Sequence, residues 1–334
     1  MKSGDVVSVN YREKTTQPTR PHVALPSSWV GGKISVYSIK SVIGEGGNGY
    51  VLLGKYNGKK YAIKVLKVRE GQGTVSVTSY FSGLSKEAAN LIDLSEWRGM
   101  VKIYAVSVDN VIDEIMRSND SLYLSDPPRL IMEYMEGGIL EGAILNDTLF
   151  YSNKWNDAVT RVASQVANAL QYVHSQGYVH LDVKPNNVFL LSPVRTAEEM
   201  EKVEVKLGDL GSATRIGKDV GQLTLEYATP EQIVETASPK MDVFSLGMTI
   251  YVSLTRRVDR PDTEHMRKAF SLASKGMMKE ARREVDEAKR CLSSWEVGNG
   301  GVGLLRDPML KRMLSPNPWD RPSMKEVTEW LSNL

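Results

Sequence analysis

The sequence predicts an α+β fold in which an antiparallel sheet is followed by a mainly helical part. Three strand-like runs fill residues 34–66, and the turn Asn57-Gly58 joins the last two as a hairpin. Residues 156–176 then carry apolar side chains at the spacing of one helix face. A block of strands ahead of a block of helices is typical of α+β proteins.

Length and composition favour a globular chain with room for two lobes. Hydrophobic residues make up 41% of the 334 positions, which suffices for a sizeable core. The 42 basic and 40 acidic residues nearly balance, so no nucleic-acid partner is expected. A single cysteine, Cys291, and an apolar run at 244–254 that is too short to cross a bilayer favour a cytoplasmic protein with no membrane partner.

Changes in composition divide the chain into three parts. Residues 1–33 lack a clean period, which indicates a flexible or loosely docked arm that Val23, Leu25 and Trp29 could fasten to the following domain. Residues 34–135 hold the strands and one helix-like stretch, and residues 136–334 are mainly helical. A charged insertion at 109–128, between two strand-like runs, is expected to be a surface loop.

Residues 180–187, His-Leu-Asp-Val-Lys-Pro-Asn-Asn, bring an acid, an amine and amides together in a loop ahead of a strand-like run. A carboxylate such as that of Asp182 could orient a hydroxyl and accept its proton. An amide five residues later, that of Asn187, could hold a metal ion bound to phosphate. An acid near an amide is also common in simple turns, so this loop alone leaves its function open.

A glycine-rich hairpin lies between the first two strand-like runs. Gly44, Gly46 and Gly49 follow a Gly-x-Gly-x-x-Gly spacing, and their missing side chains let backbone amides approach a polyphosphate. The spacing alone is a weak signal, because a tight turn would look the same. A strand, not a helix, follows it here, which argues against a dinucleotide site.

Three further charged residues stand in positions that need an explanation. Lys64 lies inside an apolar strand, so its amine either faces solvent or is held by an acid. Glu87, on a helix-like stretch at 85–94, is the candidate acid, although an exposed helix glutamate remains an alternative. Asp209 lies near the end of the strand-like run 203–207 within Gly-Asp-Leu-Gly, where a turn aspartate is the simpler reading.

In this order and spacing, the motifs resemble those of eukaryotic-like serine/threonine protein kinases over residues 34–332. Two later motifs extend the resemblance, Thr-Pro-Glu at 229–231 and Trp-Asp-Arg-Pro at 319–322. The resemblance implies a two-lobed fold with an N-lobe of antiparallel sheet plus one helix and a mainly helical C-lobe. It also implies ATP and Mg²⁺ as cofactors and a protein substrate.

The resemblance gives the matching charged positions a role in phosphoryl transfer. Asp182 would orient the substrate hydroxyl and accept its proton, and Lys184 would offset charge on the transferred group. Lys64, held by Glu87, would clamp the α- and β-phosphates. The expected magnesium ligands are Asn187 and Asp209.

The resemblance also places residues around the nucleotide. Met132 would stand beside the adenine, and backbone groups of Glu133 and Met135, in the link between the lobes, would hydrogen-bond it. The other nucleotide-binding positions are Gly44, Gly46, Gly49, Val51, Ala62 and Phe189.

Three contacts that hold the catalytic parts are implied as well. They join Thr224 to Asp182 and Lys184, Asp242 to the backbone of the loop 180–187, and Arg321 to Glu231. For Asp242, which stands near the start of an apolar helix-like run, a simple helix cap is the alternative.

One departure from the family pattern concerns regulation. Leu181 occupies the place of the usual arginine beside the catalytic acid, and that arginine normally receives a phosphate from the activation segment, here residues 212–228. The resemblance therefore does not imply switching by phosphorylation of that segment, unless other bases such as Arg215 or Lys218 receive the phosphate.

Residues 262–295 are longer than the family requires. They read as two charged helices broken near Gly276, with apolar contacts at Phe270, Met277, Ala281, Val285 and Leu292. Packing against the core is the favoured interpretation of these side chains, and docking of a partner on the solvent face is the alternative.

The hypothesis that accounts for most motifs is a protein serine/threonine kinase able to phosphorylate itself, with self-association for that reaction. A small-molecule kinase of related fold would not need Lys184, the motif at 229–231 or Arg321. A catalytically dead scaffold would usually have lost one of the charged catalytic positions, and all are present.

Overall fold

The computed structural model describes residues 7–8, 25–46, 49–67, 88–108, 120–297 and 303–334. The chain divides into two compact units. We call residues 8–97 and 101–134 the N-terminal unit, and residues 98–100 and 135–334, with the first seven residues, the C-terminal unit. One division falls between Tyr134 and Met135.

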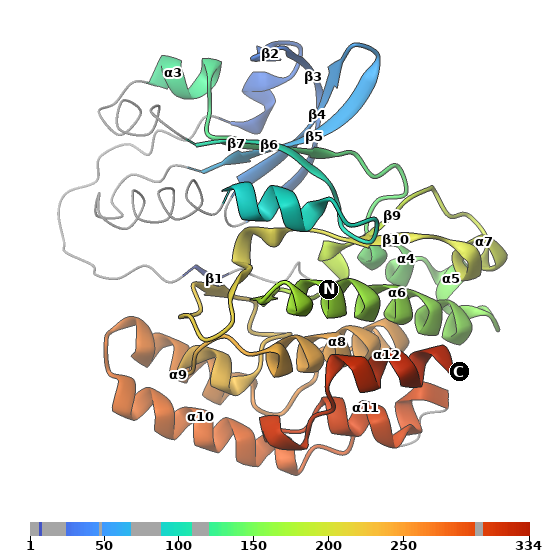
Figure 1. The fold of residues 1–334 in the computed structure, drawn as a ribbon, viewed down its shortest axis with the longest axis vertical. Coiled ribbons are helices and arrows are strands. Elements are labelled where there is room, and N and C mark those ends of the chain that lie inside the picture. The colour runs from blue at the N-terminus through green and yellow to red at the C-terminus, as the bar shows by residue number, and fades with distance from the viewer. Residues whose placement is uncertain (1–6, 9–24, 47–48, 68–87, 109–119, 298–302) are drawn as a thin grey trace. The chain divides into compact units, whose positions relative to one another are not determined.

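The N-terminal unit is built on a six-stranded antiparallel sheet with the strand order β2-β3-β4-β5-β7-β6 (Figure 1). The predicted strands are present, with ends that differ by up to three residues. Bulges next to Ser41 and Gly44 shift the register between β3 and β4. The strands are β2 (Lys33–Ile34), β3 (Tyr37–Gly46), β4 (Gly49–Tyr56), β5 (Lys59–Leu66), β6 (Ile103–Ser107) and β7 (Arg129–Glu133).

Trp29 anchors the end of the N-terminal arm to this sheet. It lies in a short 3-10 helix, Pro26–Trp29, and only 3% of the residue is exposed. Its ring packs against Tyr50 and Tyr123, with centroids 6.0 and 5.6 Å away, and its indole N–H donates to Leu124 O at 2.9 Å. The suggested fastening by Trp29 is confirmed, while Leu25 is exposed and residues 9–24 lie outside the described part.

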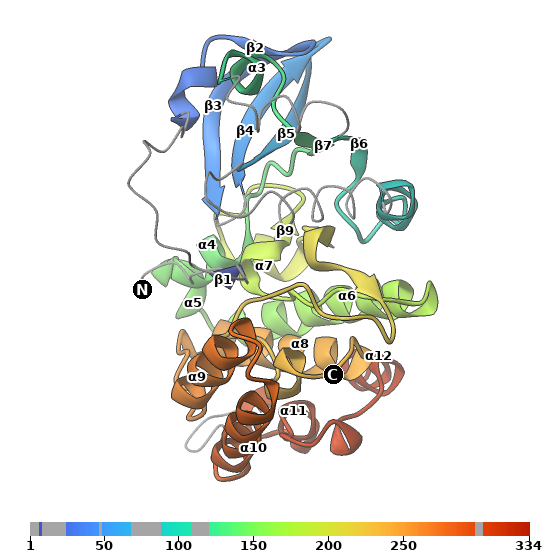
Figure 2. The same ribbon diagram turned by 90° about the vertical axis from the view of Figure 1, so that its left-hand side faces the viewer.

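The predicted surface loop at 109–128 is wrong in its second half. Residues 120–125 form a helix, α3 (Asp120–Ser125), which lies at the β2 end of the sheet in both views (Figures 1 and 2). Tyr123 is buried, and its hydroxyl donates to Leu66 O at 3.0 Å. Leu66 N donates to Pro128 O at 2.8 Å, so the insertion satisfies both backbone groups at the end of β5. Sequence patterning missed this because a helix of six residues shows no reliable period.

The C-terminal unit is mainly helical. Its two longest helices match the predicted ones closely, and Trp155 Nε1 donates to Ser253 O at 2.8 Å to join them. The helices are α4 (Leu140–Leu145), α5 (Asp147–Phe150), α6 (Trp155–Ser175), α7 (Ala197–Lys202), α8 (Pro239–Thr255), α9 (Thr263–Ser274), α10 (Met278–Ser293), α11 (Pro308–Met313) and α12 (Met324–Ser332). None of the described helices is long and apolar enough to cross a membrane.

Helix α8 is buried on nearly all sides and forms the centre of this unit. Gly247 lets α11 approach closely, because a Cβ there would stand 3.0 Å from Leu314 Cδ2. The ring of Phe244, also on α8, lies 5.3 Å from the guanidinium group of Arg260 and 5.0 Å from that of Arg321. Ser238, not Asp242, caps the N-terminus of α8, which leaves the Asp242 carboxylate available for other contacts.

Helices α9 and α10 form the predicted pair, broken at Gly276 and packed side by side (Figure 2). Ala281, Val285 and Leu292 are buried as expected, whereas Met277 at the turn is exposed. Core packing, the favoured interpretation, therefore holds for α10.

Short strands complete the C-terminal unit and carry the loops of interest. Antiparallel pairs join β9 to β10 and β8 to β11. The strands are β8 (Tyr178–Val179), β9 (Val188–Leu190), β10 (Val205–Leu207), β11 (Thr214–Arg215) and β12 (Gln222–Leu223), and a further short strand, β1 (Val7–Ser8), lies near the chain start.

Substitution of Trp29 by alanine should destabilise the N-terminal unit by about 3–5 kcal/mol, because it removes a buried aromatic side chain and its hydrogen bond. Urea unfolding followed by hydrogen exchange of the sheet amides measures this change. Leu25→Ala is the matched control, since Leu25 lies in the same arm and is exposed. Equal free energies of unfolding for the two variants would contradict the anchoring role of Trp29.

Candidate functional site

The loop at 180–187 runs from β8 to β9 and contains a 3-10 helix, Pro185–Asn187. Leu181 adopts a left-handed backbone conformation with φ of 65°, which is costly for a leucine and indicates that surrounding contacts fix the loop. Most of the loop is buried, including the side chains of Asp182, Lys184 and Asn187.

Asp182 stands at the centre of a group of polar side chains. Its Oδ1 accepts from Thr224 Oγ1 at 2.6 Å, and its Oδ2 lies 2.9 Å from Lys184 Nζ. Lys184 Nζ also donates to Thr224 Oγ1 at 2.8 Å. Asn187 Nδ2 donates to Asp182 O at 2.7 Å and to Asp182 Oδ2 at 2.8 Å. The predicted bridge from Thr224 to Asp182 and Lys184 is therefore present.

Asp242 in α8 holds the loop by its backbone. Its Oδ2 accepts from His180 N and its Oδ1 from Leu181 N, both at 2.8 Å, which confirms the predicted contact. His174 Nε2 lies 2.8 Å from Oδ2. Burial alone would raise the pKa of Asp242, but the hydrogen bond and charge of His174 and the His180 N–H outweigh it and lower that pKa. Asp242 is therefore held as a carboxylate.

Asp209 follows β10 and is placed beside the loop by backbone contacts. Its φ of 58° is left-handed, which turns the chain out of the strand. The preceding residue, Gly208, donates its N–H to Asn187 O at 2.9 Å, and its carbonyl lies 3.0 Å from His180 Nε2. Carboxylate and amide oxygens from Asp209 and Asn187 are the hard donors that Mg²⁺ prefers. Asn187 directs its Nδ2 to Asp182, so that contact does not use its Oδ1. By donor chemistry, the two residues suit a magnesium ion.

In the N-terminal unit, strand register brings the predicted nucleotide-binding residues together. Val51 on β4 pairs with Lys64 on β5 and with Gly44 on β3. Ala62 pairs with Met132 on β7. Gly46 faces open space, whereas a Cβ at Gly49 would stand 2.4 Å from Val65 O, so only glycine fits there. The requirement for glycine at position 49 therefore comes from the close approach of β5.

Glu133, Met135 and Phe189 are the remaining residues predicted to contact the adenine. Glu133 N donates to Lys102 O at 2.8 Å, which takes that N–H out of any contact with a ligand. Met135 is buried at the start of the C-terminal unit, and its carbonyl accepts from Gly138 N at 3.3 Å. Phe189 lies half-buried on β9. Glu87 lies outside the described residues, although residues 88–95 form the predicted helix.

Lys67 is a residue of this hairpin that sequence reasoning missed. Its Nζ donates to Glu45 Oε1 and to Gly46 O, both at 2.9 Å, and stands 4.4 Å from the centroid of the Tyr50 ring. The amine thus ties the end of β5 to the tip of the glycine hairpin. A lysine three positions after Lys64 gives no signal of this contact in the sequence, because the contact depends on the β4–β5 register.

Leu181 packs into an apolar cluster instead of pairing with an anion. It is 2% exposed and lies among Val179, Ala237 and Met241, with Val220 of the activation segment packed against them. Backbone bonds join the same segments, from Gly217 N to Ala237 O at 2.9 Å and from Ala237 N to Lys218 O at 2.8 Å. The activation segment is therefore held here without a charged group at position 181.

The second half of the segment rests on the α9–α10 pair. Leu223, Leu225 and Ala228 form a cluster with Met266 of α9 and Ala288 of α10. Arg260, itself paired with Asp262, donates from Nη1 to Leu225 O at 2.9 Å and to Ala228 O at 2.6 Å. The helical pair is thus a platform for the segment, a role that its charged sequence did not reveal.

The segment ends at a buried ion pair. Arg321 Nη2 donates to Glu231 Oε2 at 3.2 Å, and Arg321 Nη1 donates to the other oxygen at 2.5 Å. Glu231 and Arg321 are buried, so each charge depends on the other. The predicted pair is confirmed.

Comparisons with known proteins agree with this geometry. Residues 37–331 match the family model described as the protein kinase domain. The serine/threonine-protein kinase ArnS of Sulfolobus acidocaldarius is 36% identical over 88% of this chain and 49% of its own length. Wee1-like protein kinase 2 of Mus musculus is 30% identical over 84% of this chain and 46% of its own length. The chain thus spans about half the length of these relatives.

Leu181→Ala should lower the free energy of unfolding of the C-terminal unit by about 2–4 kcal/mol, because it leaves a cavity in the apolar cluster. Amide hydrogen exchange should rise at residues 217–220 and 236–237, which that cluster holds. Ile216→Ala is the control, because Ile216 lies in the same segment with its side chain exposed. Exchange that is unchanged in Leu181→Ala would refute the apolar attachment.

Proposed function

Because this chain belongs to the protein kinase family, we propose that it is a serine/threonine kinase that transfers the γ-phosphoryl group of ATP to hydroxyls of proteins. The family implies ATP as the phosphate donor and Mg²⁺ as the usual metal. The observation that carries the proposal is the buried contact among Asp182, Lys184 and Thr224. It places an acid, a fixed cation and a hydroxyl from the activation segment within hydrogen-bond distance of one another.

In the proposed reaction, Asp182 accepts the proton of the substrate hydroxyl as that oxygen attacks the γ-phosphorus of ATP. The bond from this phosphorus to the bridging oxygen breaks, and ADP leaves. The hydrogen bonds from Thr224 and Asn187 fix the orientation of its carboxylate. Lys184, which lies 2.9 Å from Asp182, supplies positive charge where negative charge develops on the transferred group. Because these side chains are already held by one another, little reorganisation is needed when a substrate binds.

The family also implies which residues would hold the metal ion and the nucleotide. Asn187 and Asp209 would hold Mg²⁺, which neutralises charge on the phosphates when it is bound. Lys64, held by Glu87, would clamp the α- and β-phosphates under the glycine hairpin. Val51, Ala62, Met132 and Phe189 would surround the adenine, and with Glu133 N already bonded, Met135 would supply the backbone N–H that pairs with it.

Two alternatives are less well supported. A small-molecule kinase of related fold would have no need of the Glu231–Arg321 pair or of a threonine that joins Asp182 to Lys184. A scaffold without activity would not need a carboxylate oriented by three donors. We also propose that the kinase phosphorylates itself, with self-association during that reaction.

Asp182→Asn should reduce phosphoryl transfer by at least about a thousandfold, because an amide cannot accept the hydroxyl proton. The assay incubates the chain with Mg²⁺ and labelled ATP and identifies the labelled amino acids. Serine or threonine should carry the label. Asp219→Asn, an exposed acid of the activation segment, is the control and should keep normal activity. Full activity of Asp182→Asn, or label confined to small molecules, would refute the proposal.

Lys67→Met should raise the KM for ATP about threefold to tenfold and change kcat less, because the hairpin loses the two hydrogen bonds that hold its tip. Hydrogen exchange at Glu45 and Gly46 should increase in parallel. The matched control is Lys55→Met, since Lys55 is an exposed lysine on β4 of the same sheet. If KM and exchange match those of the control, Lys67 does not position the hairpin.

A further inference from the structure

Glu226, near the end of the activation segment, carries a carboxylate that lacks a partner. Its Oε2 is buried, yet no donor or cation within the described residues contacts it. Arg260 lies close, but its Nη1 donates to the backbone carbonyl of Glu226 at 3.3 Å. The Nε and Nη2 of Arg260 are bonded to Asp262, at 2.7 and 2.6 Å. A buried acceptor without a donor is destabilising, so this oxygen calls for an explanation.

Tyr227, the next residue, places a second unpartnered polar group among acids. It is 9% exposed, and its hydroxyl makes no hydrogen bond within the part of the chain that the structure describes. Burial raises the pKa of Tyr227, and the charges of Glu141, Glu226 and Asp182 raise it further. The strongest charges that act on this phenol are therefore all negative. Ser245 Oγ donates to Tyr227 O at 2.9 Å and fixes the backbone here.

Glu141, on α4, is the second acid of this group that no cation neutralises. Its Oε2 accepts from Asn186 Nδ2 at 2.7 Å, and Asn186 belongs to the loop that carries Asp182. An amide is neutral, so this contact leaves the negative charge of Glu141 in place. Asp182 differs, because Lys184 Nζ lies 2.9 Å from its Oδ2. We call Glu141, Glu226 and Tyr227 the acidic site.

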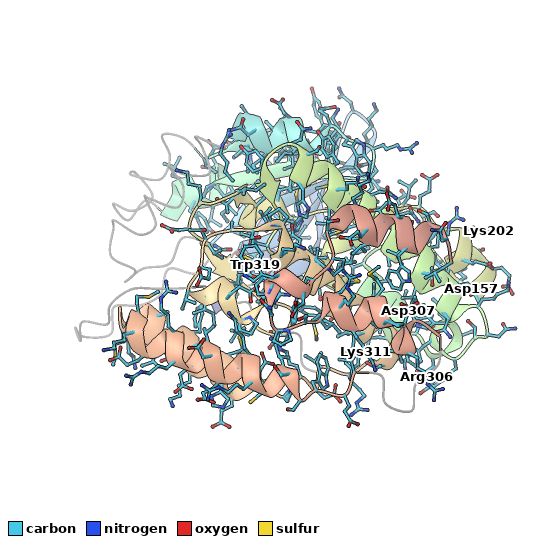
Figure 3. The ribbon with its side chains drawn as sticks, turned by 60° about the horizontal axis from the view of Figure 1, so that its bottom comes forward. Asp157, Lys202, Arg306, Asp307, Lys311 and Trp319 are labelled. Carbon is cyan, nitrogen blue, oxygen red and sulfur yellow. The ribbon has the colours of Figure 1, made fainter. Side chains whose placement is uncertain are left out.

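The groove beside α11 shows the opposite pattern of charge. Figure 3 labels Asp307 in the same part of the C-terminal unit as Arg306 and Lys311. Charges of both signs line this groove, namely those of Arg306, Lys311, Arg312, Glu296 and Asp320. Such a mixture selects neither anions nor cations. The acidic site, in contrast, contains carboxylates alone among its charged groups.

A cationic side chain fits the acidic site better than a metal ion does. Among the residues described, no three acids, histidines or cysteines form a group that could hold a metal ion. A guanidinium group spreads five N–H donors over a plane, so it can contact carboxylates that do not converge on one point. It also stacks on an aromatic ring such as that of Tyr227. These properties favour arginine over lysine.

We propose that Glu141, Glu226 and Tyr227 bind an arginine of the protein substrate. This inference rests on the proposed function, because it assigns the acidic site to the peptide that carries the acceptor serine or threonine. Glu141 is bonded to the loop of Asp182, so the arginine lies near the acceptor in the substrate chain. Each residue of an extended chain spans about 3.3 Å, and we expect the arginine within about three residues of the acceptor.

The test compares matched peptides that each contain one serine. One set carries a single arginine at each of the three positions on either side of the serine. A second set carries citrulline there, which keeps the shape of arginine but has no charge. The full chain with Mg²⁺ and labelled ATP gives kcat/KM, and fluorescence anisotropy without ATP gives Kd. At one position at least, arginine should improve both values about tenfold over citrulline, with a smaller ratio at high salt.

Variants of Glu226 connect this preference to the acidic site. Glu226→Gln keeps the shape of the side chain and should reduce the ratio between arginine and citrulline peptides to about threefold or less. Glu226→Lys should favour a glutamate at the same peptide position about threefold, an outcome that a folding defect could not produce. Glu264→Gln is the matched control, because it removes an exposed acid of α9, and it should keep the tenfold ratio.

The two measurements separate failure of this inference from failure of the proposed function. Labelled serine with equal kcat/KM and Kd for arginine and citrulline peptides would overturn the inference and leave the kinase activity standing. A tenfold preference that persists in Glu226→Gln would overturn it as well. If no peptide is labelled, the proposed function fails, and anisotropy decides the acidic site alone. Equal binding of the two sets would then refute it, whereas a preference that Glu226→Gln abolishes would support arginine binding.

Discussion

The Asp242 carboxylate is the contact on which the rest of the candidate site depends. Two consecutive backbone N–H groups, those of His180 and Leu181, donate to it, and His174 keeps it charged in a fully buried place. The left-handed backbone at Leu181 is retained because these bonds determine it. Asp182 follows directly, so a contact from the first turn of α8 fixes the backbone beside it, while Thr224 and Asn187 orient its carboxylate.

Motifs that combine charge with a fixed spacing could be predicted from the sequence. Thr224, Asp242 and the Glu231–Arg321 pair all make the contacts that the resemblance implied. Long periodic helices such as α6 were predicted to within one residue, because 21 residues repeat the apolar pattern enough to be unambiguous. Each of these features could be recognised either from the pattern within one short stretch of the chain or from the order in which several motifs occur.

Contacts set by register or by short elements could not be predicted in this way. Lys67 reaches Gly46 only because β4 and β5 pair as they do, and Tyr123 supports β5 from a helix of six residues. The contact of α9 and α10 with the activation segment could not be predicted, because it is made partly by small side chains. Ala288 is fully buried in this contact, but an alanine contributes little to a hydrophobic pattern.

The aromatic ring of Phe244 contributes to two separate contacts near the end of the activation segment. The ring contacts Arg260, whose guanidinium group donates to carbonyl groups at the end of the activation segment. It also contacts Arg321, whose guanidinium group donates to Glu231 just beyond that segment. One aromatic ring therefore contacts two cations whose partners lie a few residues apart in the chain. An aliphatic residue of similar volume would fill the space yet lose the attraction to both guanidinium groups at once, so the tolerance of this core position is set by electrostatics as well as by size.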